Sequence, residues 1–192
     1  MIRTGQHHAP NSHKPWFFGH ASLLKWKGLE TLLTVLSNMP VQQRPKSHIC
    51  YIQPKQTQLP VSSLNEGLAK VNYYPSPKNL DQIRASANIF VSTSHQEPFG
   101  LSILEALAAG QCVLIPSDGA YWDNTLVDDI NCIKYHAGDV QDLQDKLTLL
   151  CADIDRVTRI GQQGMKIASG YRASEQFLNI QTYLAQATAI QG

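Results

Sequence analysis

Two glutamates, Glu97 and Glu105, are separated by seven residues that include Pro98-Phe99-Gly100. A strand-like apolar run precedes the first glutamate, and an apolar helix pattern begins directly after the glycine. We expect Glu97 in the loop after the strand and Glu105 about one turn inside the helix, so that both carboxylates face one cleft. Carboxylates accept hydrogen bonds from sugar hydroxyls. The N–H groups at the start of a helix favour an anionic phosphate. The spacing therefore indicates a site for a sugar and a phosphate.

A simpler interpretation of the same pair is a solvated loop carboxylate followed by a residue on a helix surface. The residues around Glu105 weigh against it, because four apolar side chains flank this carboxylate: Ile103, Leu104, Ala106 and Leu107. A charge in such a place is costly without a partner. The surroundings therefore favour a functional pair.

Strand-like and helix-like segments alternate along most of the chain. Strands are expected at residues 16–18, 48–52, 71–74, 88–91, 112–115 and 132–135. Helices are expected from Gly28 to Pro40, from Ser63 (a capping box with Glu66), from Asn79, at 101–108 ending at Gly110, at 122–127, after Asp139, and around Phe177, Ile180 and Leu184. The uniformly apolar run 112–115 is typical of a parallel strand covered on both faces. The order predicts an α/β fold with one Rossmann-like, doubly wound parallel sheet.

Sheets of this type bind ligands at the carboxyl ends of their strands, where the strand order reverses. Glu97 follows the predicted strand 88–91, and the other candidate residues likewise lie at strand ends or on the loops that follow them. This placement supports a ligand site.

Composition excludes several classes of protein. The 192 residues carry a net charge of +1, with 43% hydrophobic and 16% charged residues, so the chain is neither disordered nor a basic nucleic-acid binder. No apolar run at the amino terminus resembles a signal-peptide core, and none is long enough to span a membrane, so we expect a cytoplasmic location.

Cysteines and histidines raise the possibility of disulfides or a metal site. The cysteines are dispersed without a C-x-x-C pair, at Cys50, Cys112, Cys132 and Cys151, which disfavours both a disulfide framework and a zinc site. Histidines crowd the first twenty residues, but that segment is polar and lacks a fixed face. We expect residues 1–14 to be a loose or linker segment, residues 15–190 to be one domain, and no metal.

The segment SHQEPFGLSILEALAAGQCVLIPSD, residues 94–118, resembles the donor-site signature of the retaining glycosyltransferases with the GT-B fold, the glycosyl transferases group 1. The likeness covers residues 17–183 and is specific within 92–118. It implies that the chain is the carboxyl-terminal, donor-binding half of a two-domain GT-B enzyme. The amino-terminal half, which binds the acceptor and usually supplies a catalytic histidine or acid, has no counterpart in this sequence.

The resemblance also implies roles for individual residues. Glu97 would act at the reacting centre by contacting hydroxyls of the donor sugar, and Glu105 would hold the ribose hydroxyls of the nucleotide. The Phe99-Gly100 pair and the backbone of Leu101 would lie beside sugar and phosphate.

A second group of residues resembles the phosphate site of that family. Lys27-Gly28 matches the family's Lys-Gly pair, whose lysine binds the diphosphate. Gly19-His20 stands where members usually carry Gly-Arg, so one phosphate clamp is altered. Lys25 substitutes for that arginine in charge but lacks its planar two-point geometry.

The expected function is therefore transfer of a sugar from a nucleotide diphosphate sugar to an acceptor hydroxyl with retention of configuration, in polysaccharide or glycoconjugate synthesis, without a metal or cofactor. Its partners would be the nucleotide-sugar donor and, through the other half, an acceptor glycan or lipid-linked sugar, with peripheral membrane association through that half. The isolated chain would bind without turnover.

Two alternatives remain at this stage. In the first alternative, the chain is a non-catalytic nucleotide- or sugar-binding module that acts through a partner chain. In the second, it is another nucleotide enzyme on a Rossmann-like sheet, such as an NAD-dependent dehydrogenase. The lack of G-x-G-x-x-G after the first strand disfavours the dehydrogenase.

Overall fold

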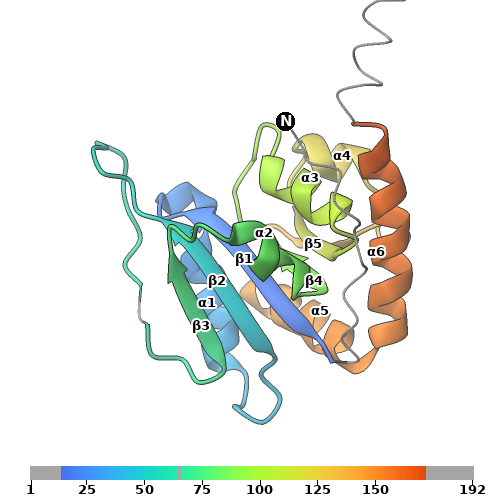
Figure 1. Cartoon of the computed structure of the whole chain (residues 1–192), viewed down its shortest axis with the longest axis horizontal. Coiled ribbons are helices and arrows are strands. Elements are labelled where there is room, and N and C mark those ends of the chain that lie inside the picture. The colour runs from blue at the N-terminus through green and yellow to red at the C-terminus, as the bar shows by residue number, and fades with distance from the viewer. Residues whose placement is uncertain (1–13, 65, 172–192) are drawn as a thin grey trace, which may run out of the picture.

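The strands of the sheet pair in parallel and in the order β3-β2-β1-β4-β5-β6 in the computed structural model, which describes residues 14–64 and 66–171 (Figure 1). The strands are β1 (Trp16–Ser22), β2 (Lys46–Ile52), β3 (Val71–Pro75), β4 (Ile89–Val91), β5 (Cys112–Ser117) and β6 (Ile133–His136). The helices are α1 (Leu29–Asn38), α2 (Leu80–Ala85), α3 (Leu101–Ala108), α4 (Tyr121–Thr125), α5 (Val140–Ala152) and α6 (Ile154–Ser169), with a 3₁₀ turn at Lys25–Lys27. The predicted doubly wound α/β fold is confirmed, and its strand order reverses between β1 and β4.

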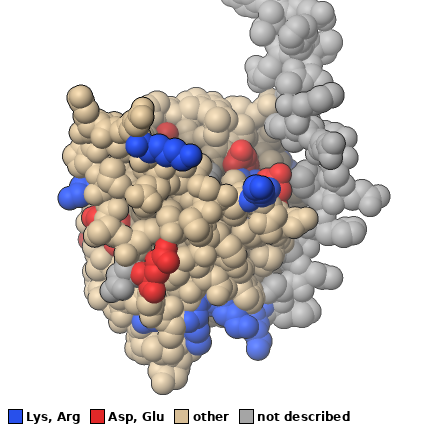
Figure 2. Space-filling view, turned by 60° about the vertical axis from the view of Figure 1, so that its left-hand side comes forward, with Lys and Arg blue, Asp and Glu red and all other residues tan. Residues whose placement is uncertain are grey.

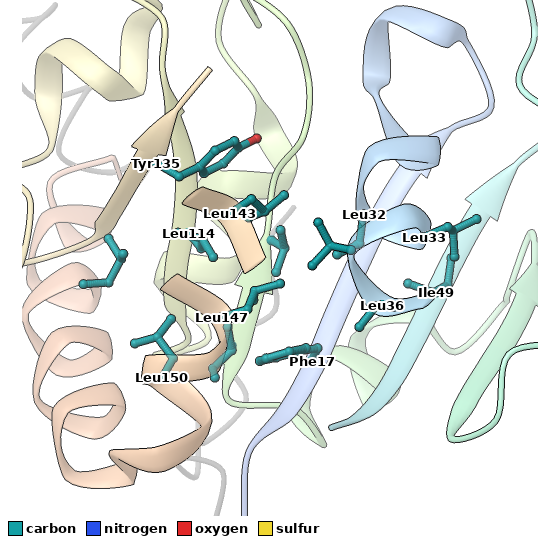
Figure 3. Packing of buried hydrophobic residues seen from close by; sticks show 14 of the residues in the cluster. Phe17, Leu32, Leu33, Leu36, Ile49, Leu114, Tyr135, Leu143, Leu147 and Leu150 are labelled. Carbon is teal, nitrogen blue, oxygen red and sulfur yellow. The ribbon is translucent and has the colours of Figure 1, made fainter. Parts of the chain in front are cut away.

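Helices cover both faces of the sheet because neighbouring strand residues point to opposite sides. Phe17 of β1 belongs to the core under α1 and α5, where Leu32 and Leu147 are fully buried (Figure 3). Phe18, the next residue, belongs to the opposite core with Leu107 of α3. The strands are thereby held from both sides, and their carboxyl ends are presented at one edge.

Strand β1 is longer than the sequence predicted. The expected strand stopped at Gly19, yet both Gly19 and His20 lie inside β1, opposite Ile49 and Cys50 of β2. A Cβ on Gly19 would come within 2.9 Å of Leu32 Cδ2, so the glycine admits helix α1 rather than ending the strand.

The helix predicted at Ser63 is absent from the described residues between β2 and β3, and α4 ends at Thr125 instead of residue 127. Glu66 does not act in a capping box. Its carboxylate accepts a hydrogen bond from the Tyr51 hydroxyl, and this bond, together with burial, raises the pKa of Tyr51 to about 12. The helix prediction depended on Glu66, and this side chain makes a tertiary hydrogen bond with Tyr51 instead.

The predicted end of α3 is confirmed, whereas two predicted segments lie outside the described residues. Helix α3 is followed by Gly110 with φ 74°, the left-handed conformation expected of a glycine after a helix. The helix predicted around Phe177, Ile180 and Leu184, and most of the segment 1–14, lie outside the described residues. Within the described part, no helix combines the length and apolarity needed to cross a membrane.

Charged side chains of both signs are interspersed on the face shown in Figure 2, and most of that face is uncharged. It therefore offers no continuous basic surface of the kind that grips nucleic acid.

The contact between α6 and the start of β5 provides a test of the packing. Gly161 is buried in α6, and a Cβ there would lie 2.2 Å from the backbone oxygen of Gly110. Alanine normally favours a helix interior by about 1 kcal/mol over glycine. We nevertheless expect Gly161→Ala to lower the free energy of unfolding by roughly 2 kcal/mol, because the backbones must separate.

The matched control is Gly170→Ala at the end of α6, where an added Cβ has its nearest neighbour at 3.6 Å. Urea unfolding followed by circular dichroism measures both variants. Equal stability of Gly161→Ala and the parent protein would show that α6 does not pack this closely.

Candidate functional site

Two hollows adjoin at the edge of the sheet where β1, β4 and β5 end, and they share Ser92 and Ser94 as wall residues. The first encloses about 240 Å³, open solvent included, and the second about 230 Å³. Polar residues of the first are Ser92, Ser94, Glu97, Asp118 and Asp123, and the second contains Gly19, Ala21, Lys27, Leu29 and Thr93. The hollows therefore lie at the switch point of the strand order, where this type of sheet binds ligands.

The side chains of Lys27 and Glu97 form an ion pair between the two hollows. Lys27 lies in the turn after β1 and Glu97 in the loop after β4, and their side chains are 21% and 16% exposed. The Lys27 ammonium also lies 4.0 Å from the centre of the Trp26 ring. The cation predicted for a diphosphate and the carboxylate predicted for a sugar thus neutralise each other, a pairing that sequence reasoning missed.

Backbone contacts hold Lys27 against the end of β4. Gly28 has φ 66°, and a Cβ on it would lie 2.1 Å from the carbonyl oxygen of Thr93. The Thr93 hydroxyl donates to the Lys27 carbonyl at 3.1 Å, and the His95 N–H donates to the Trp26 carbonyl at 2.9 Å. Only a glycine permits this approach, which explains the Lys-Gly pair in physical terms.

The Glu97 loop is held from its other side by the segment after β5. The Asp118 carboxylate accepts from the Gln96 N–H at 2.7 Å, and the Trp122 indole N–H donates to the Gly100 carbonyl at 3.3 Å. Trp122 is buried in the core on the α3 side of the sheet. Both ends of the loop are therefore fixed before a ligand arrives.

Asp123 supplies a further charge at the base of the first hollow. It accepts hydrogen bonds from the Gly119 N–H at 2.8 Å and from the Ser117 hydroxyl, and forms an ion pair of 2.9 Å with Lys134. Burial alone would raise the pKa of Asp123, but these hydrogen bonds and the Lys134 ammonium outweigh it and lower the pKa. Asp123 is thus paired with Lys134 and fixes the backbone between β5 and α4.

Glu105 lies in the second turn of α3, as predicted. It does not line the hollow that contains Glu97, contrary to the expectation of one shared cleft, and it engages a different cation. Its carboxylate meets the guanidinium of Arg84 from α2, while 47% of the Glu105 side chain remains exposed. Sequence reasoning missed Arg84. In the sequence, Arg84 is a cation next to an apolar position of the helix predicted after Asn79. That position does not show which carboxylate the arginine contacts.

The remaining predicted residues are spread around the same edge. Gly19 lines the second hollow, while Lys25 is exposed in the turn after β1. Gly100 precedes the first turn of α3 with φ 71°, and Leu101 is exposed. His20 lies in β1 opposite Cys50.

Phe99 belongs to an aromatic cluster with Tyr121, Trp122 and Tyr171, with ring centres 5.1–6.3 Å from Phe99. The hydroxyls of Tyr121 and Tyr171 lie 2.6 Å apart. The cluster ties the Glu97 loop to α4 and to the end of α6. It was not anticipated because Tyr171 is far away in sequence.

Among the described residues, no group of three or more His, Cys, Asp or Glu side chains is placed to hold a metal ion. The four cysteines are free thiols, three of them buried.

The approach of Gly28 to Thr93 can be tested by substitution. Gly28→Ala and Gly138→Ala both place alanine at a positive φ, 66° and 81°, but an added Cβ at Gly138 meets nothing within 4 Å. Both should incur the left-handed backbone strain of roughly 1–2 kcal/mol. We expect Gly28→Ala to lose about 2 kcal/mol more in urea unfolding, because it also strikes the Thr93 carbonyl. An equal loss in the two variants would contradict the close approach.

Comparison with known proteins identifies the family of the chain. The family model described as glycosyl transferases group 1 matches residues 4–167. No curated protein sequence matches the chain.

Three similar solved structures illustrate the likeness in fold. Sucrose-phosphate synthase from Thermosynechococcus elongatus superposes with a TM-score of 0.71 at 18% identity, covering 93% of this chain and 46% of that one. Anabaena HepE in complex with UDP-glucose gives 0.70 at 20% identity, covering 91% and 49%. The C-terminal domain of a glycosyl transferase group 1 family protein (LpcC) from Francisella tularensis gives 0.63 at 23% identity, covering 83% and 89%.

The chain thus spans about half the length of the first two structures and most of the isolated carboxyl-terminal domain. A family match over most of its length and a GT-B-like fold lead to one conclusion: the chain belongs to the glycosyl transferases group 1.

Proposed function

We propose that the chain is the donor-binding half of a retaining glycosyltransferase that moves a sugar from a nucleotide diphosphate sugar to an acceptor hydroxyl. The Lys27–Glu97 pair at the switch point carries this proposal. It places the cation that suits a diphosphate beside the carboxylate that suits sugar hydroxyls. HepE, a protein of similar fold, is described in complex with UDP-glucose, which supports a nucleotide-sugar ligand.

Binding of the donor proceeds by exchange of partners. The diphosphate takes the Lys27 ammonium, and Glu97 is released to accept hydrogen bonds from the sugar. Gly28 and Thr93 hold the Lys27 backbone, so only the end of the side chain has to move. When the sugar–phosphate bond breaks, negative charge grows on the leaving diphosphate, and Lys27 stabilises it. Glu105 holds the nucleoside through its ribose hydroxyls.

The reaction of the whole enzyme forms part of the same proposal. The chain covers less than half of the sucrose-phosphate synthase structure. We therefore place the acceptor-binding site, and any acid or base that acts on the acceptor, in an amino-terminal half. We place the reaction in polysaccharide or glycoconjugate synthesis in the cytoplasm, without a metal ion. The isolated chain binds the donor but does not turn it over.

Calorimetry with UDP, GDP, ADP, CDP and dTDP, and with the matching nucleotide sugars, tests the exchange. We expect at least one pair of ligands to bind. Lys27→Met should weaken both members of the pair by about tenfold or more, because each loses a charge-assisted hydrogen bond. Glu97→Gln should weaken only the nucleotide sugar, because the sugar loses its carboxylate acceptor. Binding of the nucleotide alone should not weaken, since Lys27 then has no internal carboxylate to release.

Lys166→Met is the matched control, because Lys166 lies in the last turn of α6 and is exposed. It should leave both affinities unchanged. If the parent chain binds none of these ligands, donor binding by this chain is refuted. Equal weakening of nucleotide and nucleotide sugar by Glu97→Gln would refute the exchange alone.

A further inference from the structure

Arg84 is a buried cation at the interface of α2 and α3. Its side chain is 7% exposed, and its guanidinium donates to Asp81 at 2.6 Å and to Glu105. Asp81 belongs to the same helix as Arg84, whereas Glu105 comes from α3. The Asp81 side chain is 93% exposed, so water readily replaces that contact. Through Glu105, Arg84 contacts a residue that the proposed function assigns to the donor nucleotide.

The position of Arg84 is set by contacts with strand β1 and with the residue that precedes β5. The guanidinium lies 5.6 Å from the ring centre of Phe18 in β1. Gln111, fully buried just before β5, donates to the carbonyls of Arg84 at 2.9 Å and Ala87 at 3.1 Å. The end of α2 is thus pinned to the sheet, and the Arg84 side chain has little freedom.

Stability alone does not account for an arginine at this place. Its Nε atom is buried and has no hydrogen-bond partner among the described residues. A buried donor without a partner is costly, and a hydrophobic residue of similar volume often replaces a buried ion pair without loss of stability. The cost is explained if the contact with Glu105 serves binding.

We propose that Arg84 is a positioning residue that orients Glu105 to receive the ribose hydroxyls of the donor nucleotide. Arg84 Nη2 binds Oε2 of Glu105, while 47% of the Glu105 side chain remains exposed. A half-exposed glutamate would otherwise sample several rotamers, and binding would have to select one. Arg84 restricts that choice beforehand and leaves the exposed part of the carboxylate for the ligand. The inference rests on the proposed function.

The test compares two ligands that differ only in the ribose hydroxyls. The ribonucleoside diphosphate that binds the parent chain most tightly is titrated by calorimetry alongside its 2′,3′-dideoxy counterpart, and the ratio of their dissociation constants gives the ribose preference. We expect a preference of about tenfold or more in the parent, which Glu105→Ala abolishes. Arg84→Met should reduce the preference severalfold while leaving the affinity for the dideoxy ligand unchanged.

Three further variants separate positioning from a structural role. Asp81→Asn removes the other carboxylate of Arg84 and should keep the ribose preference intact. Arg84→Lys keeps the charge and should recover part of the preference, and it provides a second variant if Arg84→Met does not fold. Adding Arg84→Met to Glu105→Ala should change neither affinity further, because the residue on which Arg84 acts is gone.

The outcomes distinguish failure of the Arg84 inference from failure of the proposed donor-binding function. If no ribonucleoside diphosphate binds the parent chain, the proposed function fails and the inference fails with it. If the parent binds and Glu105→Ala abolishes the preference, but folded Arg84 variants retain it or weaken both ligands equally, the inference alone is overturned.

Discussion

The ion pair between Lys27 and Glu97 is the contact on which the candidate site depends. It joins the turn after β1 to the loop after β4, across the point where the strand order reverses. Its geometry requires Gly28, whose lack of a Cβ admits the Thr93 carbonyl, and Asp118, whose carboxylate holds the start of the Glu97 loop. These two supports hold the loop that carries Glu97 beside the turn that carries Lys27.

A second ion pair, Arg84–Glu105, lies between α2 and α3 on one face of the same sheet. In both pairs a carboxylate expected to contact the ligand is neutralised by a cation of the chain itself. A site built in this way needs no broad basic surface, which agrees with the net charge of +1 and with the mixed charges of Figure 2. A diphosphate would therefore enter by exchanging partners within the site rather than by adding to an excess of positive charge.

Much of the fold followed from local patterns, and the exceptions have tertiary causes. The spacing of apolar residues in α1 and α3 and the apolar run of β5 each predicted the right element, because burial on a helix stripe or on both strand faces leaves a periodic trace. Gly19 was misjudged as a strand end because its small size serves a contact with Leu32. The capping box at Ser63 failed because Glu66 binds Tyr51 instead.

The sequence by itself determined the fold class, the family and the positions of Glu97 and Glu105 along their loop and helix, since these depend on local spacing and on a contiguous motif. Only the tertiary structure decided which cation meets each glutamate. Lys27 lies 70 positions from Glu97, and Arg84 lies 21 from Glu105, so neither pair follows from helix or strand periodicity. The order of the strands and the placement of α2 and α3 over the same core bring these charges together, and ion pairs leave no periodic trace in the chain.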